Sequence, residues 1–335
     1  MRSVIEKSHF VLGPEVDMFE KSFARYTGTQ YCISVSSGTE ALKLALESIG
    51  VGQGDEVVLP VNTFVASALA VTALGAIPRF VDCNENNFLI NMDKALDTFG
   101  ARTKAFMPVH LYGKMVDADA LNAVTIPVIE DAAQAHGAES KGKKAGSVGL
   151  AGCFSFYPSK NLGAYGDGGA IVTSDGNLRD VLLLLRNHGQ TRKYYHDIKG
   201  SNARLDGIQA AVLSVKLKYL DKCNELRRSA AFFYTKNLKE GIFRTEGDSV
   251  YHLYVIRIKN RDELQAKLGS AGIATGVHYP VPLHLQKCFN DLDHGSYPVA
   301  ERLAGEILSL PMYPHISPNQ LEYVVEKVNQ WAEPI

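Results

Sequence analysis

Lys160 is the residue of this sequence whose position most favours covalent chemistry. It lies in a polar, glycine-containing turn between two short apolar runs, residues 153–157 and 170–173. Each run is typical of a buried strand, so the turn is expected at the ends of strands, where α/β proteins bind their ligands. An amine in that place can attack a carbonyl group, whereas the simpler alternative is a solvated loop charge.

Asp131 provides an acidic group near the same predicted edge. It ends an apolar strand that begins at Pro127, and Gln134 and His136 follow it. Asp131 and Lys160 can therefore belong to one site, or they can form a structural ion pair without any function. His136 is expected to be a hydrogen-bonded or core histidine rather than a ligand.

A strand-to-helix transition at residues 37–40 is a candidate phosphate site. The strand-like residues 31–36 run directly into Ser37, Gly38, Thr39 and Glu40, and the apolar spacing that follows is helical. The first amides of a helix lack partners and lie at the positive end of its dipole, which favours a bound phosphate. Capping by a Ser or Thr side chain is the commoner use of such residues, and the two roles are compatible.

Phe64 follows the end of another predicted strand, residues 57–60. Its ring could cover a flat cofactor, although a core position is the commoner fate of an aromatic residue. Strands at 57–60, 77–81 and 105–110 alternate with helical or loop segments, which predicts an α/β fold with a large, mostly parallel sheet and helices on both faces. This domain is expected to comprise residues 1–218, and residues 219–335 a smaller C-terminal α+β domain.

The composition favours a protein that acts on small molecules. The 335 residues include 35 Lys and Arg against 36 Asp and Glu, so the formal charge of −1 gives no footprint for nucleic acid or an anionic membrane. The five cysteines are far apart and show neither a disulfide pattern nor a zinc pattern, so no metal is expected. The sequence lacks a signal peptide and a membrane-spanning run, which predicts a cytoplasmic location.

The lysine, the acid, the helix start and the aromatic ring are together the parts of a site for pyridoxal 5′-phosphate (PLP). The lysine binds the aldehyde as a Schiff base, the carboxylate keeps the ring nitrogen protonated, and the helix start holds the phosphate. In their order, these parts resemble the sugar-nucleotide aminotransferases of the DegT, DnrJ and StrS type, which have the aspartate aminotransferase fold. The motifs that carry the resemblance are residues 36–42 (SSGTEAL), 130–134 (EDAAQ), 154–163 (FSFYPSKNLG) and 200–206 (GSNARLD).

The resemblance implies a role for each candidate residue. Lys160 and Asp131 are the catalytic lysine and the partner of the ring nitrogen, Gln134 contacts the ring hydroxyl, and Phe64 stacks on the ring. The remaining implied contacts are Gly38, Thr39, Glu40 and Ser155 to the phosphate, His278 and Tyr279 to the substrate, and Asn202 to the cofactor of the other subunit in a homodimer with shared sites.

The resemblance also implies transfer of an amino group from glutamate to a nucleotide-linked keto sugar. Residues 157–169 and 277–282 are most similar to members that aminate C3 of a dTDP-3-keto-6-deoxyhexose. The alternatives are C4 amination of a 4-keto sugar nucleotide, C3 amination of a UDP-linked 3-keto uronic acid, and a PLP-binding regulatory protein. An NAD enzyme is disfavoured because residues 36–39 lack the GxGxxG motif. Members of the family usually begin earlier, with a strand and the front of the first helix, whereas this chain starts inside that helix, so a truncated N-terminus is expected.

Overall fold

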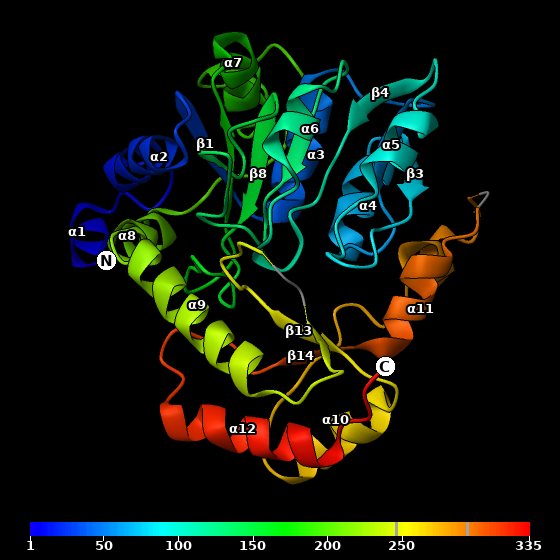
Figure 1. The fold of residues 1–335 in the computed structure, drawn as a ribbon. Helices are drawn as coiled ribbons and strands as arrows, with labels where there is room; N and C mark the ends of the chain where they lie inside the picture. Colours follow the sequence, from blue (N-terminus) through cyan, green and yellow to red (C-terminus); the bar gives the residue numbers. More distant parts are fainter. Residues whose placement is uncertain (245–246, 293–294) are drawn as a thin grey trace.

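The computed structural model describes residues 1–244, 247–292 and 295–335, which form a larger and a smaller part (Figure 1). The sheet strands of the larger part are β1 Tyr31–Val35, β2 Glu56–Pro60, β3 Ile77–Val81, β4 Thr103–Phe106, β5 Ile129–Asp131, β8 Ala151–Ser155 and β9 Gly169–Thr173. They are ordered β3-β2-β4 and β5-β8-β9-β1, and parallel bridges from Phe106 to Val128 and from Val109 to Asp131 connect the two groups. Strand β9 is antiparallel to both neighbours and the other pairs are parallel, which confirms the predicted mostly parallel sheet.

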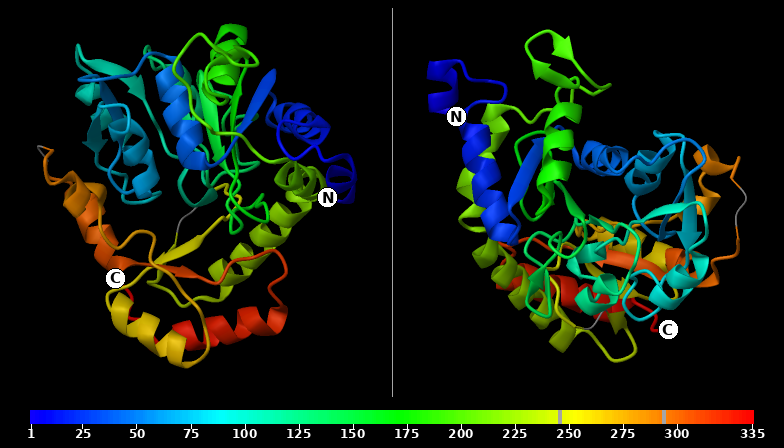
Figure 2. Two further views of the ribbon diagram at one scale, coloured as in Figure 1. Left: turned by 180° about the vertical axis from the view of Figure 1, so that it is seen from behind. Right: turned by 90° about the horizontal axis from the view of Figure 1, so that it is seen from above.

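Helices cover both faces of this sheet because its strands are apolar on both sides. The helices of the larger part are α1 Arg2–Lys7, α2 Pro14–Thr27, α3 Gly38–Ser48, α4 Val65–Thr72, α5 Met92–Thr98, α6 Ala118–Asn122, α7 Gly176–Leu185 and α8 Gly207–Leu217. Side chains alternate along a strand, so Cys153 of β8 joins the core around α3 and α7, whereas Phe154 joins the core around α2 and α8. The two helix layers are visible from above in Figure 2.

The smaller part is an antiparallel sheet packed against long helices. Its elements are α9 Leu220–Asn237, β12 Phe243–Arg244, β13 Tyr254–Arg257, α10 Arg261–Ser270, β14 Ile307–Leu310 and α12 Pro318–Trp331. The strands are ordered β12-β13-β14, and Tyr234, Ile256 and Leu308 lie in the core between sheet and helices. Ser317 and Gln320 form a capping box at the start of α12.

Segments after residue 219 also pack on the larger part. Helix α11 (Pro298–Glu306) contributes Ala300 and Leu303 to the core around α3. Asp82 accepts hydrogen bonds from the Val299 and Ala300 amides at 3.1 and 2.9 Å, which ties the start of α11 to the end of β3. The two parts therefore share a large interface, and the division at residues 218 and 219 remains a proposal.

Residues 190–204 contain a short hairpin. Strands β10 (Gln190–Arg192) and β11 (Tyr195–His196) pair antiparallel, and Figure 2 shows this hairpin projecting from the body of the molecule. A second hairpin joins β6 (Glu139–Ser140) to β7 (Lys143–Lys144). Tyr194 and Tyr195 are 78% and 54% exposed, so the first hairpin presents aromatic rings to the outside.

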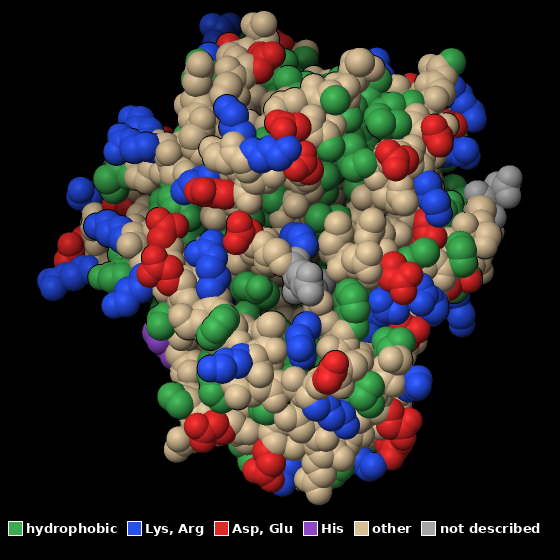
Figure 3. All heavy atoms as spheres, in the orientation of Figure 1, with side chains coloured by type: hydrophobic (Ala, Val, Ile, Leu, Met, Phe, Trp, Pro, Cys, Tyr) green, Lys and Arg blue, Asp and Glu red, His purple; other side chains and the backbone are tan. Residues whose placement is uncertain are grey.

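The surface carries both signs of charge. Acidic and basic side chains are interspersed over the face in Figure 3, as the formal charge of −1 leads one to expect. Among the residues that the structure describes, none of the helices has the length and apolar character that crossing a membrane requires.

Candidate active site

A cavity of about 350 Å3 lies where the carboxyl ends of the large sheet face the smaller part. Most of the predicted site residues line it, namely Gly38, Thr39, Phe64, Asp131, Gln134, Ser155, Lys160, His278 and Tyr279. These residues come from five separate stretches of the chain. The sheet edge therefore brings together the groups that the sequence analysis placed at strand ends.

Asp131 is buried at the end of β5 and is held by two donors. Ser67 Oγ of α4 donates to Oδ2 at 2.8 Å, and the Ala133 amide donates to Oδ1 at 3.1 Å. Burial raises the pKa of the Asp131 carboxyl, although Ser67, Ala133 and the charge of Lys160 act against this shift. A carboxylate in such surroundings gains from a positively charged partner inside the cavity.

Lys160 lies in the turn between β8 and β9, where its amide donates to the Tyr157 carbonyl at 2.9 Å. Its side-chain amine makes no hydrogen bond within the part of the chain that the structure describes. Burial lowers the pKa of Lys160 to about 8, and the Asp131 carboxylate acts against that shift. Such an amine is partly neutral near pH 7, so it can act as a nucleophile and as a proton acceptor.

The N-terminus of α3 contacts the end of β8 closely. A Cβ atom on Gly38 would lie 2.7 Å from Ser155 Cβ, so only glycine fits there. Ser37 Oγ accepts a hydrogen bond from the Glu40 amide at 3.2 Å and thereby caps the helix. The first amides of α3 and the Ser155 hydroxyl lie together at the positive end of a helix, an arrangement that suits a phosphate group.

Gln134 connects the acidic side of the cavity to the smaller part. Its Oε1 accepts from the Tyr112 amide at 2.7 Å, and its Nε2 donates to Tyr279 Oη at 3.1 Å. Tyr112 Oη donates to the His278 carbonyl, and His278 Nδ1 pairs with Ser309 Oγ of β14 at 2.9 Å. These contacts fix both predicted substrate residues, His278 and Tyr279, on the cavity wall.

Phe64 occupies the N-cap position of α4 rather than the core. Half of its surface is exposed, and its ring centroid lies 5.5 Å from that of Tyr279 with the two planes tilted by 37°. The ring therefore lines the cavity and remains free to contact a flat ligand.

Glu40 and Asn202 are not among the residues that line the cavity. The Glu40 carboxylate pairs with Lys43 at 3.3 Å. Asn202 is exposed and bridges to Asn187, and the following residue, Ala203, accepts a hydrogen bond from the Ser36 amide. Within a single chain, the structure thus places neither side chain in the cavity.

Thr63, Ser67 and His252 are among the cavity residues that were not singled out from the sequence. Thr63 and Ser67 share a hydrogen bond at 3.0 Å, and Ser67 binds Asp131. His252 reaches the cavity from the smaller part. Ser67 lies four residues after Thr63, in the segment that follows the end of β2. This closeness to a strand end was the only feature of the sequence that could have indicated a place in the site. His252 gave no such signal, because it lies just before β13, a strand of the other sheet.

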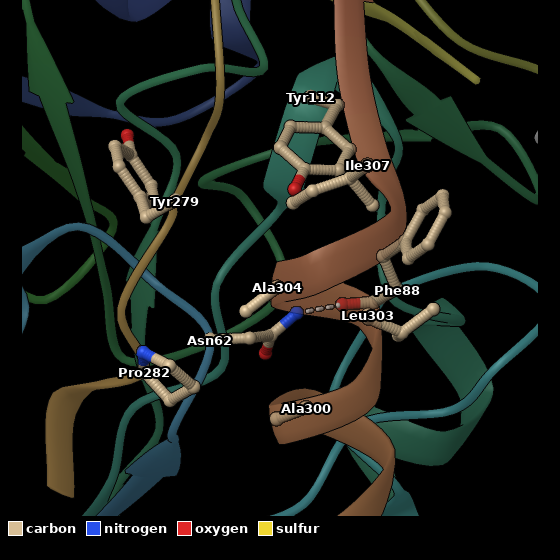
Figure 4. Close-up of a pocket in the computed structure, with 9 residues that line it drawn as sticks. All are labelled: Asn62, Phe88, Tyr112, Tyr279, Pro282, Ala300, Leu303, Ala304 and Ile307. Atoms are coloured by element: carbon tan, nitrogen blue, oxygen red, sulfur yellow. Dashed lines mark hydrogen bonds between the residues drawn. The ribbon is translucent and has the colours of Figure 1, made fainter. Parts of the chain in front are cut away.

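A much smaller cavity, about 10 Å3, lies behind Tyr279 (Figure 4). The Asn62 amide nitrogen donates to the Phe88 carbonyl at 2.8 Å, and Asn62 Oδ1 is buried without a partner. The space suits at most one water molecule. No group of three or more His, Cys, Asp or Glu side chains among the described residues is arranged to hold a metal ion.

Comparisons with known proteins relate the whole chain to one group. A model of the DegT/DnrJ/EryC1/StrS aminotransferase family matches residues 1–329. The chain is 46% identical to the erythromycin biosynthesis sensory transduction protein EryC1 of Saccharopolyspora erythraea, over 99% of this chain and 94% of that protein. It is 45% identical to the dTDP-3-amino-3,6-dideoxy-alpha-D-galactopyranose transaminase of Aneurinibacillus thermoaerophilus, with coverage of 99% and 94%.

A solved structure agrees closely with this fold. The crystal structure of DesV from S. venezuelae in complex with a ketimine intermediate superposes with a TM-score of 0.95. The two chains are 43% identical, and the match covers 100% of this chain and 93% of that one.

Proposed function

The chain belongs to the DegT/DnrJ/EryC1/StrS aminotransferase family, and we propose that it transfers the amino group of glutamate to C3 of a dTDP-linked 3-keto-6-deoxyhexose. The observation that carries the proposal is the single cavity that holds Lys160, Asp131 and the start of α3 together. A lysine of lowered pKa, a buried acid and a helix start are the groups that amino transfer with PLP requires.

The enzymes of this family use PLP, and the residues present fit that cofactor. Gly38 leaves space between α3 and Ser155 that a side chain would fill, so the helix amides remain open to a phosphate. Asp131, with both oxygens held and its pKa raised by burial, suits the protonated ring nitrogen. Phe64 would lie against the ring, and Gln134 would contact the ring hydroxyl.

The side chains then have defined tasks. When bound, PLP supplies an electron sink that acidifies the carbon carrying the transferred nitrogen. Lys160 Nζ, with a pKa of about 8, can take a proton from the α-carbon of glutamate and later deliver one to C3 of the sugar. The nitrogen ends on the sugar, and the sugar carbonyl oxygen leaves as water. One water molecule enters in the other half-reaction and supplies the keto oxygen of the 2-oxoglutarate that glutamate becomes.

Two observations support a nucleotide-linked sugar with its keto group at C3. His278 and Tyr279 enter the cavity from the smaller part, beside Gln134 and Phe64, and offer polar contacts to hydroxyl groups. A relative that is 45% identical over 99% of this chain is named as a transaminase of a dTDP-3-amino-3,6-dideoxy sugar. C4 amination, a UDP-linked uronic acid and a regulatory protein without catalysis are less favoured.

A panel of substrates tests the proposal. The purified enzyme is incubated with glutamate and, separately, with 3-keto and 4-keto dTDP-6-deoxyhexoses and a UDP-linked 3-keto uronic acid. Mass spectrometry and NMR of the products are expected to show an amino group at C3 of the dTDP sugar. Amination of the 4-keto sugar or the uronic acid in preference would overturn the assignment of C3 or of the dTDP sugar, respectively.

The proposal includes a homodimer in which Asn202 reaches the phosphate of the other subunit's cofactor. Asn202 is exposed and is not among the residues that line the cavity of its own chain, and the hairpin just before it projects from the molecule. The hairpin and the N-terminal segment also expose apolar side chains, among them Tyr194, Tyr195 and Phe10. A twofold axis would pair these surfaces and complete two equal sites.

Mixing of subunits tests the shared site. Lys160→Ala chains, which keep Asn202, are mixed with Asn202→Ala chains, which keep Lys160. Each mixed dimer should regain one complete site, whereas the Asn202→Ala homodimer should bind PLP weakly. Asn290→Ala, another exposed asparagine, serves as the control. Tight cofactor binding by the Asn202→Ala homodimer, with no recovery on mixing, would show that each site is built from one chain.

The location in the cytoplasm and the division at residues 218 and 219 also remain proposals. All five cysteines are free thiols in the structure, which supports a reducing compartment.

A further inference from the structure

A buried chain of hydrogen bonds connects the residue after Lys160 to the cavity. His252 Nδ1 pairs with Asn161 Oδ1 at 3.2 Å. Asn161 Nδ2 donates to Asn224 Oδ1 and to the Val250 carbonyl, both at 2.9 Å. Asn224 Nδ2 donates to the His136 carbonyl at 2.9 Å. The network therefore joins α9, the Lys160 turn and the segment before β13.

The ends of this network fix the direction of every bond within it. The Val250 and His136 carbonyls can only accept, so the amide nitrogens of Asn161 and Asn224 must face them. Asn161 Oδ1 is then the atom that faces His252, and an amide oxygen can only accept. His252 must therefore carry its proton on Nδ1, which leaves Nε2 with a free lone pair.

The free lone pair of His252 lies on the cavity wall. His252 lines the cavity, and its Nε2 is not among the buried atoms without a partner, unlike both ring nitrogens of His136. Lys160 lines the same cavity, and its amine makes no hydrogen bond within the described residues. An acceptor of fixed tautomer and a donor without an acceptor thus share one space.

We propose that His252 is a positioning residue for Lys160: a rotation of the lysine side chain within the cavity they share brings the amine to His252 Nε2, which accepts a hydrogen bond from it when the amine is not bonded to the cofactor. The inference rests on the proposed function, because it concerns the lysine that moves the proton. Asn161, next to Lys160 in the chain, holds the imidazole in the required tautomer. The released amine is thereby held inside the cavity between proton transfers.

The charges around the pair favour a neutral imidazole. Burial lowers the pKa of His252, and the positive charges of Lys160 and Arg227 and the imidazoles of His136 and His278 lower it further. Asp131 is the acid that faces Lys160. When Asp131 binds the ring nitrogen, a neutral His252 remains as an acceptor for the amine.

The tautomer can be measured directly in the full-length protein without cofactor. Histidine labelled with 15N in the ring gives NMR spectra that distinguish a proton on Nδ1 from one on Nε2. The His252 signals are identified by their loss in the His252→Gln variant. The proposal requires a neutral ring with its proton on Nδ1, and a proton on Nε2 would overturn it.

The second measurement is the pKa of Lys160, taken from the rate at which PLP attaches to the protein as the pH is varied. An acceptor stabilises the ammonium form, so His252→Leu is expected to lower the midpoint by about one pH unit. His252→Gln retains an acceptor oxygen and should stay near the wild-type midpoint. His136→Phe, which replaces a buried ring that is not among the residues lining this cavity, is the packing control.

The outcomes separate the proposal from its alternatives. An equal shift in His136→Phe would assign the effect to packing, and an unchanged midpoint in His252→Leu would exclude the hydrogen bond. Neither measurement uses the sugar, so they stand even if the proposed substrate is wrong.

Discussion

Replacing Asp131 by Asn isolates the charge of the buried acid from its shape. In the variant, the amide oxygen can still accept from the Ala133 amide, and the new NH2 group faces Ser67 Oγ. Ser67 can accept this hydrogen and donate to Thr63 instead, because their bond at 3.0 Å functions in either direction. The hydrogen bonds are thus conserved in number, so the free energy of unfolding should change by no more than about 1 kcal/mol.

The rate should change far more than the stability. A neutral amide cannot keep a proton on the ring nitrogen. The other acid on the cavity wall, Asp167, belongs to the β8–β9 turn beyond Lys160, so it does not replace Asp131. Loss of a preorganised electrostatic stabiliser typically costs about 3–4 kcal/mol, or about 10²–10³-fold in rate. We therefore expect Asp131→Asn to bind PLP and to fall by at least about 10²-fold in single-turnover rate with glutamate.

Stopped-flow single turnovers with glutamate measure this rate, and PLP content and thermal unfolding are measured alongside. Ser67→Ala is the matched control, because it removes one hydrogen bond and leaves the carboxylate. The single-turnover rate of Ser67→Ala should fall by about 10- to 100-fold at most, which corresponds to the loss of a hydrogen bond to a charged group. A rate for Asp131→Asn within about threefold of wild type in cofactor-loaded protein would refute the role of Asp131.

The remaining predictions concern Lys160 and Gly38. Borohydride reduction of the yellow, PLP-loaded enzyme followed by peptide mapping should find the pyridoxyl group on Lys160, and an adduct on another lysine would contradict the assignment. Attachment of PLP to the cofactor-free protein should accelerate as the pH rises, with a midpoint near 8, because only the neutral amine attacks; a midpoint near 10.5 would mean that burial does not lower this pKa. Gly38→Ala should lower the free energy of unfolding by about 1–3 kcal/mol and weaken PLP binding, because the alanine Cβ would lie 2.7 Å from Ser155 Cβ. Gly269→Ala in α10 is the control and should not destabilise the protein, because the space around Gly269 is open. Equal effects of the two substitutions in thermal unfolding and PLP titration would refute the steric argument.

The sequence predicted the parts of the site that depend on local order along the chain. Ser37, Phe64 and Asp131 lie at or soon after the ends of strands that could be recognised from apolar runs and turn residues, and such positions meet at one edge of an α/β sheet. The same reasoning placed Lys160 at that edge. Strand β9 is antiparallel to β8, which the sequence did not indicate, but the turn between them still places Lys160 at the cavity.

The parts that escaped prediction depend on pairing between distant segments. His252 meets Asn161 across 91 residues, and Asn224 meets the His136 carbonyl across 88 residues. The hydrophobic periodicity of a single segment cannot predict such contacts, because they depend on how the smaller part packs on the larger one. Helix α11 escaped for the same reason, since its apolar side faces the core of the larger part.

Transfer of 15N from labelled glutamate to the sugar tests the central claim most directly. The PLP-loaded enzyme is incubated with [15N]glutamate and a dTDP-3-keto-6-deoxyhexose, and the product is examined by mass spectrometry and NMR, with Lys160→Ala as the control. We predict an amino sugar with 15N bonded to C3, formed together with 2-oxoglutarate by the wild type and not by the variant. A wild-type enzyme that is fully loaded with PLP and leaves 15N in glutamate with every keto sugar nucleotide offered would contradict the proposed function.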